Sequence, residues 1–78
     1  MIHIAARASI TFTIPPSPTL RPAMISISTE KPGEFEDYAS LIQLARTAVA
    51  EEALLNGWVL ASINWIEGPF FAFVEPSS

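Results

Sequence analysis

The sequence contains no cysteine and only one histidine among its 78 residues. Without thiols the chain can form no disulfide framework, thiolate metal site or thiol nucleophile, and this absence favours a reducing compartment. The lone histidine, His3, lacks the neighbouring ligands that a zinc site needs, and we interpret it as a solvated strand residue. The 3 glycines are dispersed and form no phosphate-binding loop. We therefore expect no catalytic residue, no metal site and no cofactor.

Basic residues are also scarce, with 4 Lys and Arg against 8 Asp and Glu and a net charge of −4. Affinity for a phosphate backbone comes from clustered Lys and Arg, so direct binding to nucleic acid is disfavoured. No apolar run approaches the roughly 20 residues of a membrane span, and the N-terminus does not match a secretion signal. Because half of the residues are apolar, we expect a packed core. These features predict one soluble, cytoplasmic domain over residues 1–78.

The N-terminal part of the chain predicts a β-hairpin. From Ile2 to Ile14 every even residue is apolar, while the odd residues are mostly polar, which is typical of a strand with one buried and one wet face. Residues 15–22 hold four prolines and predict an extended loop. The alternation resumes over 23–29, so a second strand should return beside the first.

The apolar pattern also suggests a register for this hairpin. Placing Ile14 opposite Ala23 brings the apolar side chains of both strands to the same face. The same register sets Arg7 opposite Glu30 on the outer face, where an ion pair contributes about 0.2 to 1 kcal/mol. We expect this register.

The middle of the chain predicts one long amphipathic helix. Residues 31–33 form a turn, and from Glu34 or Phe35 the apolar residues follow a helical period up to Leu55. Asn56-Gly57 should end the helix, since glycine adopts the left-handed conformation of a C-terminal cap without strain. The predicted buried stripe consists of Phe35, Tyr38, Leu41, Ile42, Ala45, Ala48, Val49 and Leu55.

The C-terminal part predicts a second hairpin. Residues 58–65 and 70–74 are extended and apolar, and residues 66–69, with Gly68-Pro69, should form a tight loop between them. The tail, residues 75–78, is expected to be loose. The whole sequence therefore predicts an α+β fold of order ββαββ, in which one helix packs on one face of a four-stranded antiparallel sheet.

This second hairpin is apolar on both faces, whereas a single helix can cover only one face of the sheet. In the predicted register Val59, Ile63 and Phe70 belong to the face beneath the helix. The opposite face then carries an uncovered apolar patch, with roughly 150 to 250 Å² for each aromatic side chain. The predicted patch consists of Trp58, Leu60, Phe71, Phe73 and Met24.

Three explanations of this apolar patch remain open. A register slip of one residue would bury Phe71 and Phe73 and expose other apolar side chains. The patch could instead be a homodimer seam, since closed dimers are the commonest assemblies. It could equally be the site of a different protein partner, because aromatic residues are enriched in interface cores.

An acidic cluster is the second candidate for partner binding. It consists of Glu34, Glu36 and Asp37, where the predicted helix begins. Carboxylates in a first helical turn are favoured by the helix dipole, so the cluster also has a purely structural explanation.

The alanine-rich helix ending in Asn56-Gly57, followed by an aromatic hairpin ending in Phe73-Val74-Glu75-Pro76, resembles some small acidic anti-CRISPR proteins of phages and mobile elements. The resemblance is one of layout, and it covers the chain from the helix to the tail. It implies a stoichiometric inhibitor that binds a bacterial defence protein, such as a CRISPR effector subunit, in the bacterial cytoplasm. No motif is shared, so no functional residue is transferred.

Three functions follow from these observations. The first is a non-enzymatic protein-binding module, an inhibitor that acts through the sheet patch or the acidic cluster. The second is a homo-oligomeric structural or assembly protein. The third is a single-stranded nucleic-acid binder that stacks bases on Trp58 and Phe71, and the shortage of Lys and Arg places it last.

Overall fold

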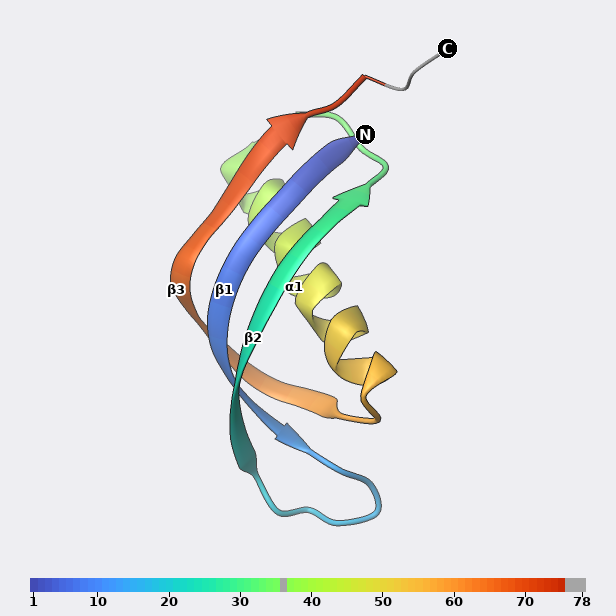
Figure 1. Ribbon diagram of the computed structural model, residues 1–78, viewed down its shortest axis with the longest axis vertical. Helices are drawn as coiled ribbons and strands as arrows, with labels where there is room; N and C mark the ends of the chain where they lie inside the picture. The colour runs from blue at the N-terminus through green and yellow to red at the C-terminus, as the bar shows by residue number, and fades with distance from the viewer. Residues whose placement is uncertain (36, 76–78) are drawn as a thin grey trace.

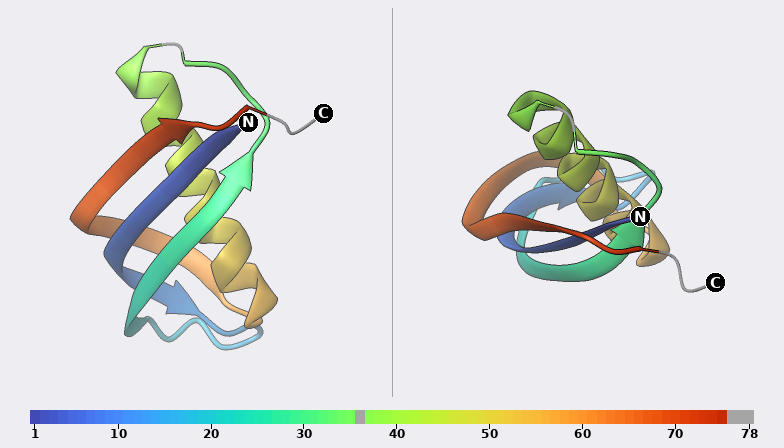
Figure 2. Two further views of the ribbon diagram at one scale, coloured as in Figure 1. Left: turned by 45° about the horizontal axis from the view of Figure 1, so that its top comes forward. Right: turned by 90° about the horizontal axis from the view of Figure 1, so that it is seen from above.

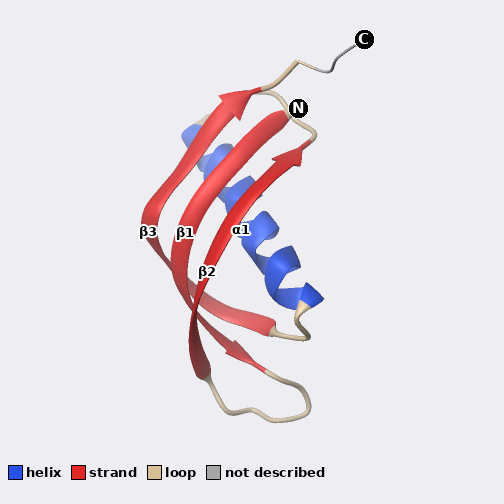
Figure 3. Cartoon of the chain, in the orientation of Figure 1, coloured by secondary structure: helices blue, strands red, loops and turns tan. Residues whose placement is uncertain are grey.

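The computed structural model describes residues 1–35 and 37–75. Its elements are β1 (Ile2–Thr13), β2 (Arg21–Lys31), α1 (Tyr38–Leu55) and β3 (Val59–Phe73). The strands form one antiparallel sheet in the order β2-β1-β3 (Figure 1). The sheet is bent, and the helix lies across one of its faces, so the molecule has two layers (Figure 2, Figure 3). The α+β class, the antiparallel sheet and the single covering helix are confirmed.

The central strand β1 follows the predicted alternation. Its even residues from Ile2 to Phe12 are all buried, and they form the floor of the core beneath the helix. Its odd residues are half-buried or exposed on the other face. A strand in the middle of the sheet has its backbone hydrogen-bonded on both sides, so β1 is the element that holds the fold together.

The predicted register between β1 and β2 is wrong. Ala23 lies opposite Ile10, not Ile14, and Arg7 lies opposite Ser26, not Glu30. Ile14 leaves the ladder because its carbonyl accepts a hydrogen bond of 2.9 Å from the Ser17 amide, which closes a turn. The shift is even, and the apolar residues therefore stay on the same face.

The proline-rich loop is shorter at its C-terminal end than predicted. Arg21 and Pro22 already belong to β2, opposite Phe12 and Thr11. Proline is compatible with this position because β2 is an edge strand, where one side of the backbone needs no ladder hydrogen bond.

The helix begins three to four residues later than predicted, at Tyr38. Asp37 is the N-cap: its backbone is extended, with φ −77° and ψ 162°, and its Oδ1 accepts a hydrogen bond of 3.0 Å from the Ser40 amide. A capping residue has non-helical backbone angles, so the helix cannot extend to Glu34 or Phe35. The predicted C-terminal end is confirmed, with Asn56 as the C-cap and Gly57 at φ +79°.

The buried stripe of the helix is narrower than predicted. Phe35, Tyr38 and Leu55 are exposed, the first because it precedes the helix and the others because they lie at its two ends. Small side chains dominate the stripe, which allows a close approach between helix and sheet. The buried helix residues are Leu41, Ala45, Ala48, Val49 and Ala53.

The predicted second hairpin is wrong, because residues 59–73 form a single strand that pairs with β1 along its whole length. Ile2 lies opposite Phe73 and Thr13 opposite Val59, so 15 residues of β3 face 12 residues of β1. Register shifts between β3 and β1 accommodate the extra residues of β3. Two of these shifts lie close to Gly68, whose φ is +80°. Residues 66–69 therefore form part of a bulge instead of a turn, and the order is ββαβ with three strands.

Candidate interaction surfaces

The structure does not bring the predicted apolar patch together. Trp58, Leu60 and Phe71 are half-buried and pack against the core. Leu60 lies opposite Phe12 and Phe71 opposite Ile4, so both share the face that the helix covers. The Trp58 ring stacks on the Phe12 ring, with centroids 4.1 Å apart and planes 16° from parallel. These three residues belong to the periphery of the core.

The other two members of the predicted patch lie far from each other in the sheet. Met24 is exposed on β2, in register with Ser9 on the face away from the helix. Phe73 is exposed at the end of β3, in register with Ile2 on the face toward the helix. They occupy opposite edges and opposite faces of the sheet, so no single surface contains both.

The face of the sheet away from the helix is largely polar. The Ser28 hydroxyl and His3 Nε2 are hydrogen-bonded at 3.1 Å, and the Thr11 and Ser62 hydroxyls are hydrogen-bonded to each other. An ion pair of 3.9 Å joins Arg7 and Glu67.

Phe70, like Met24, is an exposed apolar residue on this polar face. It is exposed beside Ala5, although we expected it beneath the helix. The bulge near Gly68 changes the register of β3, and the two halves of the strand therefore do not follow the faces of the predicted hairpin.

The acidic cluster is only partly described. Glu34 and Asp37 are exposed, and Glu36 lies outside the described residues. Hydrogen bonds from Ser40 to the carboxylate hold the pKa of Asp37 below its ordinary value of 3.8. Asp37 is thus an ionised helix cap, and Glu34 precedes the helix, so neither lies in the first helical turn, where the structural explanation had placed the carboxylates.

An aromatic surface that sequence reasoning missed lies at the end of the molecule where β3 ends and α1 begins (Figure 1). We call it the aromatic end and define it as Met1, Phe35, Tyr38 and Phe73. The Phe35 and Phe73 rings are in contact, with centroids 6.1 Å apart and planes tilted by 48°, yet the residues are 50% and 51% exposed. A hydrogen bond of 2.9 Å from the Val74 amide to the Met1 carbonyl joins the residue after β3 to the residue before β1 beside it. The sequence feature that could have indicated this surface is Phe35. Because it precedes the helix cap Asp37, it cannot belong to the buried stripe of the helix.

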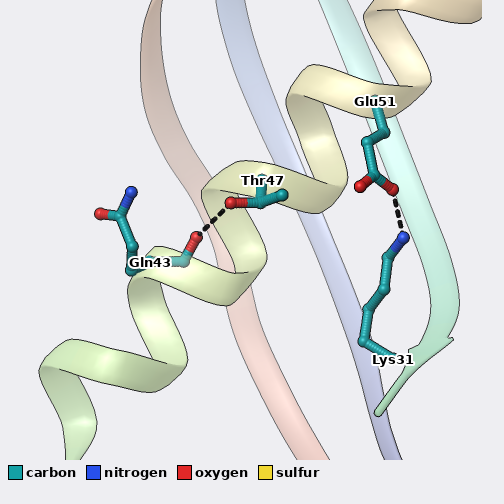
Figure 4. Close-up of polar contacts among 4 residues, drawn as sticks. All are labelled: Lys31, Gln43, Thr47 and Glu51. Atoms are coloured by element: carbon teal, nitrogen blue, oxygen red, sulfur yellow. Dashed lines mark hydrogen bonds and ion pairs between the residues drawn. The ribbon is translucent and has the colours of Figure 1, made fainter. Parts of the chain in front are cut away.

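A groove of about 600 Å³ runs between β2 and the C-terminal half of α1. The ion pair between Lys31 and Glu51 bridges strand and helix at its rim, and a turn earlier the Thr47 hydroxyl donates to the Gln43 carbonyl (Figure 4). Leu54 and Leu55 line the groove although they are 66% and 83% exposed. The groove was not predicted; its only sequence signal is a pair of leucines at the helix end.

Comparison with protein-family models, with curated proteins and with solved structures finds no match to this chain. Within the described residues, no helix combines the length and the apolar character that crossing a membrane requires. In the same residues, no three His, Asp or Glu side chains gather closely enough to hold a metal ion. The surfaces described above therefore have to be interpreted from their own chemistry.

Proposed function

We propose that the protein is a non-enzymatic protein-binding module that docks through its aromatic end on a partner with an apolar, basic surface. The observation that carries this proposal is the pair formed by Phe35 and Phe73, two rings in contact that remain half exposed. Aromatic side chains of this kind form the buried anchors of protein interfaces. A partner that covers both rings would remove a large apolar area from water.

The charge around the aromatic end indicates the chemistry of the partner. Glu34, Asp37 and Glu75, all exposed, lie within two positions of Phe35 or Phe73 along the chain, and no Lys or Arg does. Exposed carboxylates steer association toward a basic surface and fix the orientation of the complex. The net charge of −4 acts in the same direction. We therefore propose a partner site in which Lys or Arg side chains surround an apolar pocket.

The resemblance to small acidic anti-CRISPR proteins names the first class of partner to test. We propose that the protein is a stoichiometric inhibitor of a bacterial defence complex, whose nucleic-acid groove is a basic surface of the required kind. The inhibitor would occupy that groove and exclude its nucleic acid.

The nucleic-acid hypothesis receives less support from the structure. Trp58 and Phe71, the two expected stacking residues, pack against the core on the face that the helix covers. Neither ring lies on the open face of the sheet, where successive bases would stack.

Calorimetric titration of purified CRISPR effector complexes with the protein tests the proposal. The double substitution Phe35→Ser with Phe73→Ser should weaken binding by at least about thirty-fold, as expected for removal of interface anchors. The double substitution Glu34→Gln with Asp37→Asn should weaken binding more at low salt than at high salt, while Asn at position 37 still caps the helix.

The control is Phe70→Ser, which removes a more exposed phenyl ring from the opposite face of the sheet. It should leave affinity unchanged. If the effector complexes bind the protein and the Phe35 and Phe73 substitutions do not weaken that binding, the aromatic end is not the docking surface. If no effector complex binds, the inhibitor assignment fails.

A further inference from the structure

The two edges of the sheet are protected to very different degrees. An unprotected edge strand offers free N–H and C=O groups to any further strand, and proteins block this with charges, prolines and bulges. The edge strand β3 has all three devices in its middle, with Glu67, Pro69 and the register shifts next to them. The edge strand β2 has none between Ala23 and Thr29, and it pairs with β1 without a register shift.

The groove provides room for a strand beside β2. The helix crosses the sheet obliquely, and its C-terminal end extends beyond β2 (Figure 1, Figure 2). The second half of β2 lines the groove on the sheet side, and Leu54 and Leu55 line it on the helix side. A strand paired with β2 would lie about 4.8 Å from it and cover both leucines.

Self-pairing of β2 is compatible with its charges. In antiparallel strands, residues that lie opposite each other point to the same face of the sheet. If both helices are to lie on one face of the joined sheet, the two-fold axis must therefore pass through a residue of β2 and not between two residues. If the axis passes through Ile27, Ser26 lies opposite Ser28 of the partner subunit. In this register neither Lys31 nor Glu30 lies opposite a residue of the same charge. Centring on Ser26 would instead oppose Lys31 to Arg21 of the partner subunit, which is unfavourable.

The area of this contact is sufficient for a weak but specific dimer. Residues 23–31 overlap in the register centred on Ile27, and they span about 30 Å at roughly 3.4 Å per residue. The molecule is 17 Å thick along its shortest axis. A strip of these dimensions buries up to about 500 Å² per copy, or up to about 1,000 Å² in total, which reaches the lower limit for a specific interface.

We propose that two copies of this chain pair through β2, forming one continuous antiparallel sheet with both helices on the same face. Leu54 and Leu55 of each copy are then covered by the second copy. This proposal is independent of the protein-binding proposal, because the aromatic end lies away from the groove and stays exposed in the dimer.

Sedimentation equilibrium from about 1 μM to 1 mM tests the dimer, since a small interface dissociates on dilution. The mass should rise with concentration from 8.5 kDa toward twice that value. Changing Ser26 and Ser28, both exposed, to Lys opposes like charges across the two-fold axis and should raise the dissociation constant at least about tenfold. Changing both to Glu should have the same effect, and an equimolar mixture of the two variants should restore the dimer.

The matched control changes Ser62 and Asn64 to Lys. These residues have the same spacing and exposure on the other edge strand, β3, and the change should leave the dissociation constant unaltered. A mass of 8.5 kDa at every concentration would overturn the proposal. So would a dimer that the control weakens as much as the Ser26 and Ser28 changes, or a mixture that stays monomeric.

Discussion

Gly68 lies so close to Ala5 that a Cβ atom on the glycine would be 2.9 Å from the Ala5 carbonyl oxygen. The same atom would be 2.8 Å from the Phe70 amide nitrogen, and the φ angle of Gly68 is +80°. Only glycine combines this conformation with this approach of two backbones. The bulge that keeps β3 continuous therefore depends on the absence of a side chain at this position.

We predict that Gly68→Ala lowers the free energy of unfolding by about 2 to 3 kcal/mol, because it adds a steric clash to an unfavourable φ angle. Gly57→Ala is the control, since its φ angle is +79° but no atom lies within 4 Å of the added Cβ. The control should cost about 1 to 2 kcal/mol, the conformational term alone. Urea unfolding measures both values. Equal losses for the two variants would contradict the role of the Ala5 contact.

The stacked rings of Phe12 and Trp58 lead to a second prediction. Trp58→Ala should lower the free energy of unfolding by about 2 to 4 kcal/mol, because it removes the ring that covers a buried phenylalanine at the end of the core. Phe70→Ala, which removes a residue 64% exposed on the other face, should change it by less than about 1 kcal/mol. Thermal unfolding followed by circular dichroism distinguishes them. If both variants had the same small effect, Trp58 would be a surface residue, as its place in the predicted patch implied.

The parts of the fold that could be predicted from the sequence depend on local patterns. The alternation from Ile2 to Phe12 identifies the buried face of β1 because the side-chain period of a strand is independent of its partners. Asn56-Gly57 identifies the end of the helix because a cap is a property of adjacent residues. By contrast, Gly68-Pro69 suits a turn and a bulge equally, and the long partner strand β1 decides between them.

The candidate surfaces were harder to predict for a related reason. The prediction assumed a four-stranded sheet under one helix. It therefore assigned Trp58 and Phe71 to the face of the sheet that the helix does not cover. In the structure the bulge near Gly68 places Phe71 on the helix side, and a separate register shift lies next to Leu60. The Trp58 ring meets Phe12, which lies 46 positions earlier in the chain. The contact between Phe35 and Phe73 is equally remote in sequence. Periodicity carries no information about such pairs.

The ion pair of Arg7 and Glu67 next to the bulge should contribute little to stability. Its charged atoms are 3.9 Å apart, and the two side chains are 52% and 64% exposed. Solvent screens a pair of this kind, so Glu67→Gln should change the free energy of unfolding by less than about 0.5 kcal/mol. Urea unfolding at low and high salt checks this. A larger, salt-dependent loss would show that the pair helps to hold the bulge.

Asp37 should make the stability of the protein depend on pH in the acidic range. Its pKa is lowered from the ordinary value of 3.8 by hydrogen bonds from Ser40, so the ionised form is bound more favourably in the folded state. Its contribution to stability is therefore complete above pH 3.8 and is lost as the pH falls through the lower pKa of the folded state. Asn at position 37 caps the helix without titrating, so the advantage of the wild type over Asp37→Asn should disappear at strongly acidic pH.

Asp37→Ala separates the cap from the charge. It removes the acceptor of the Ser40 amide at every pH, and it should lower the Tm by roughly 4 to 8 °C at neutral pH. As the pH falls and the wild-type carboxylate is protonated, the difference between the wild type and Asp37→Ala should shrink, because the wild type loses the ionised acceptor that the alanine variant never had. Thermal unfolding of the wild type and both variants at several pH values measures these differences. A Tm difference between the wild type and Asp37→Ala that stays constant from neutral to strongly acidic pH would show that the carboxylate does not cap the helix in its ionised form.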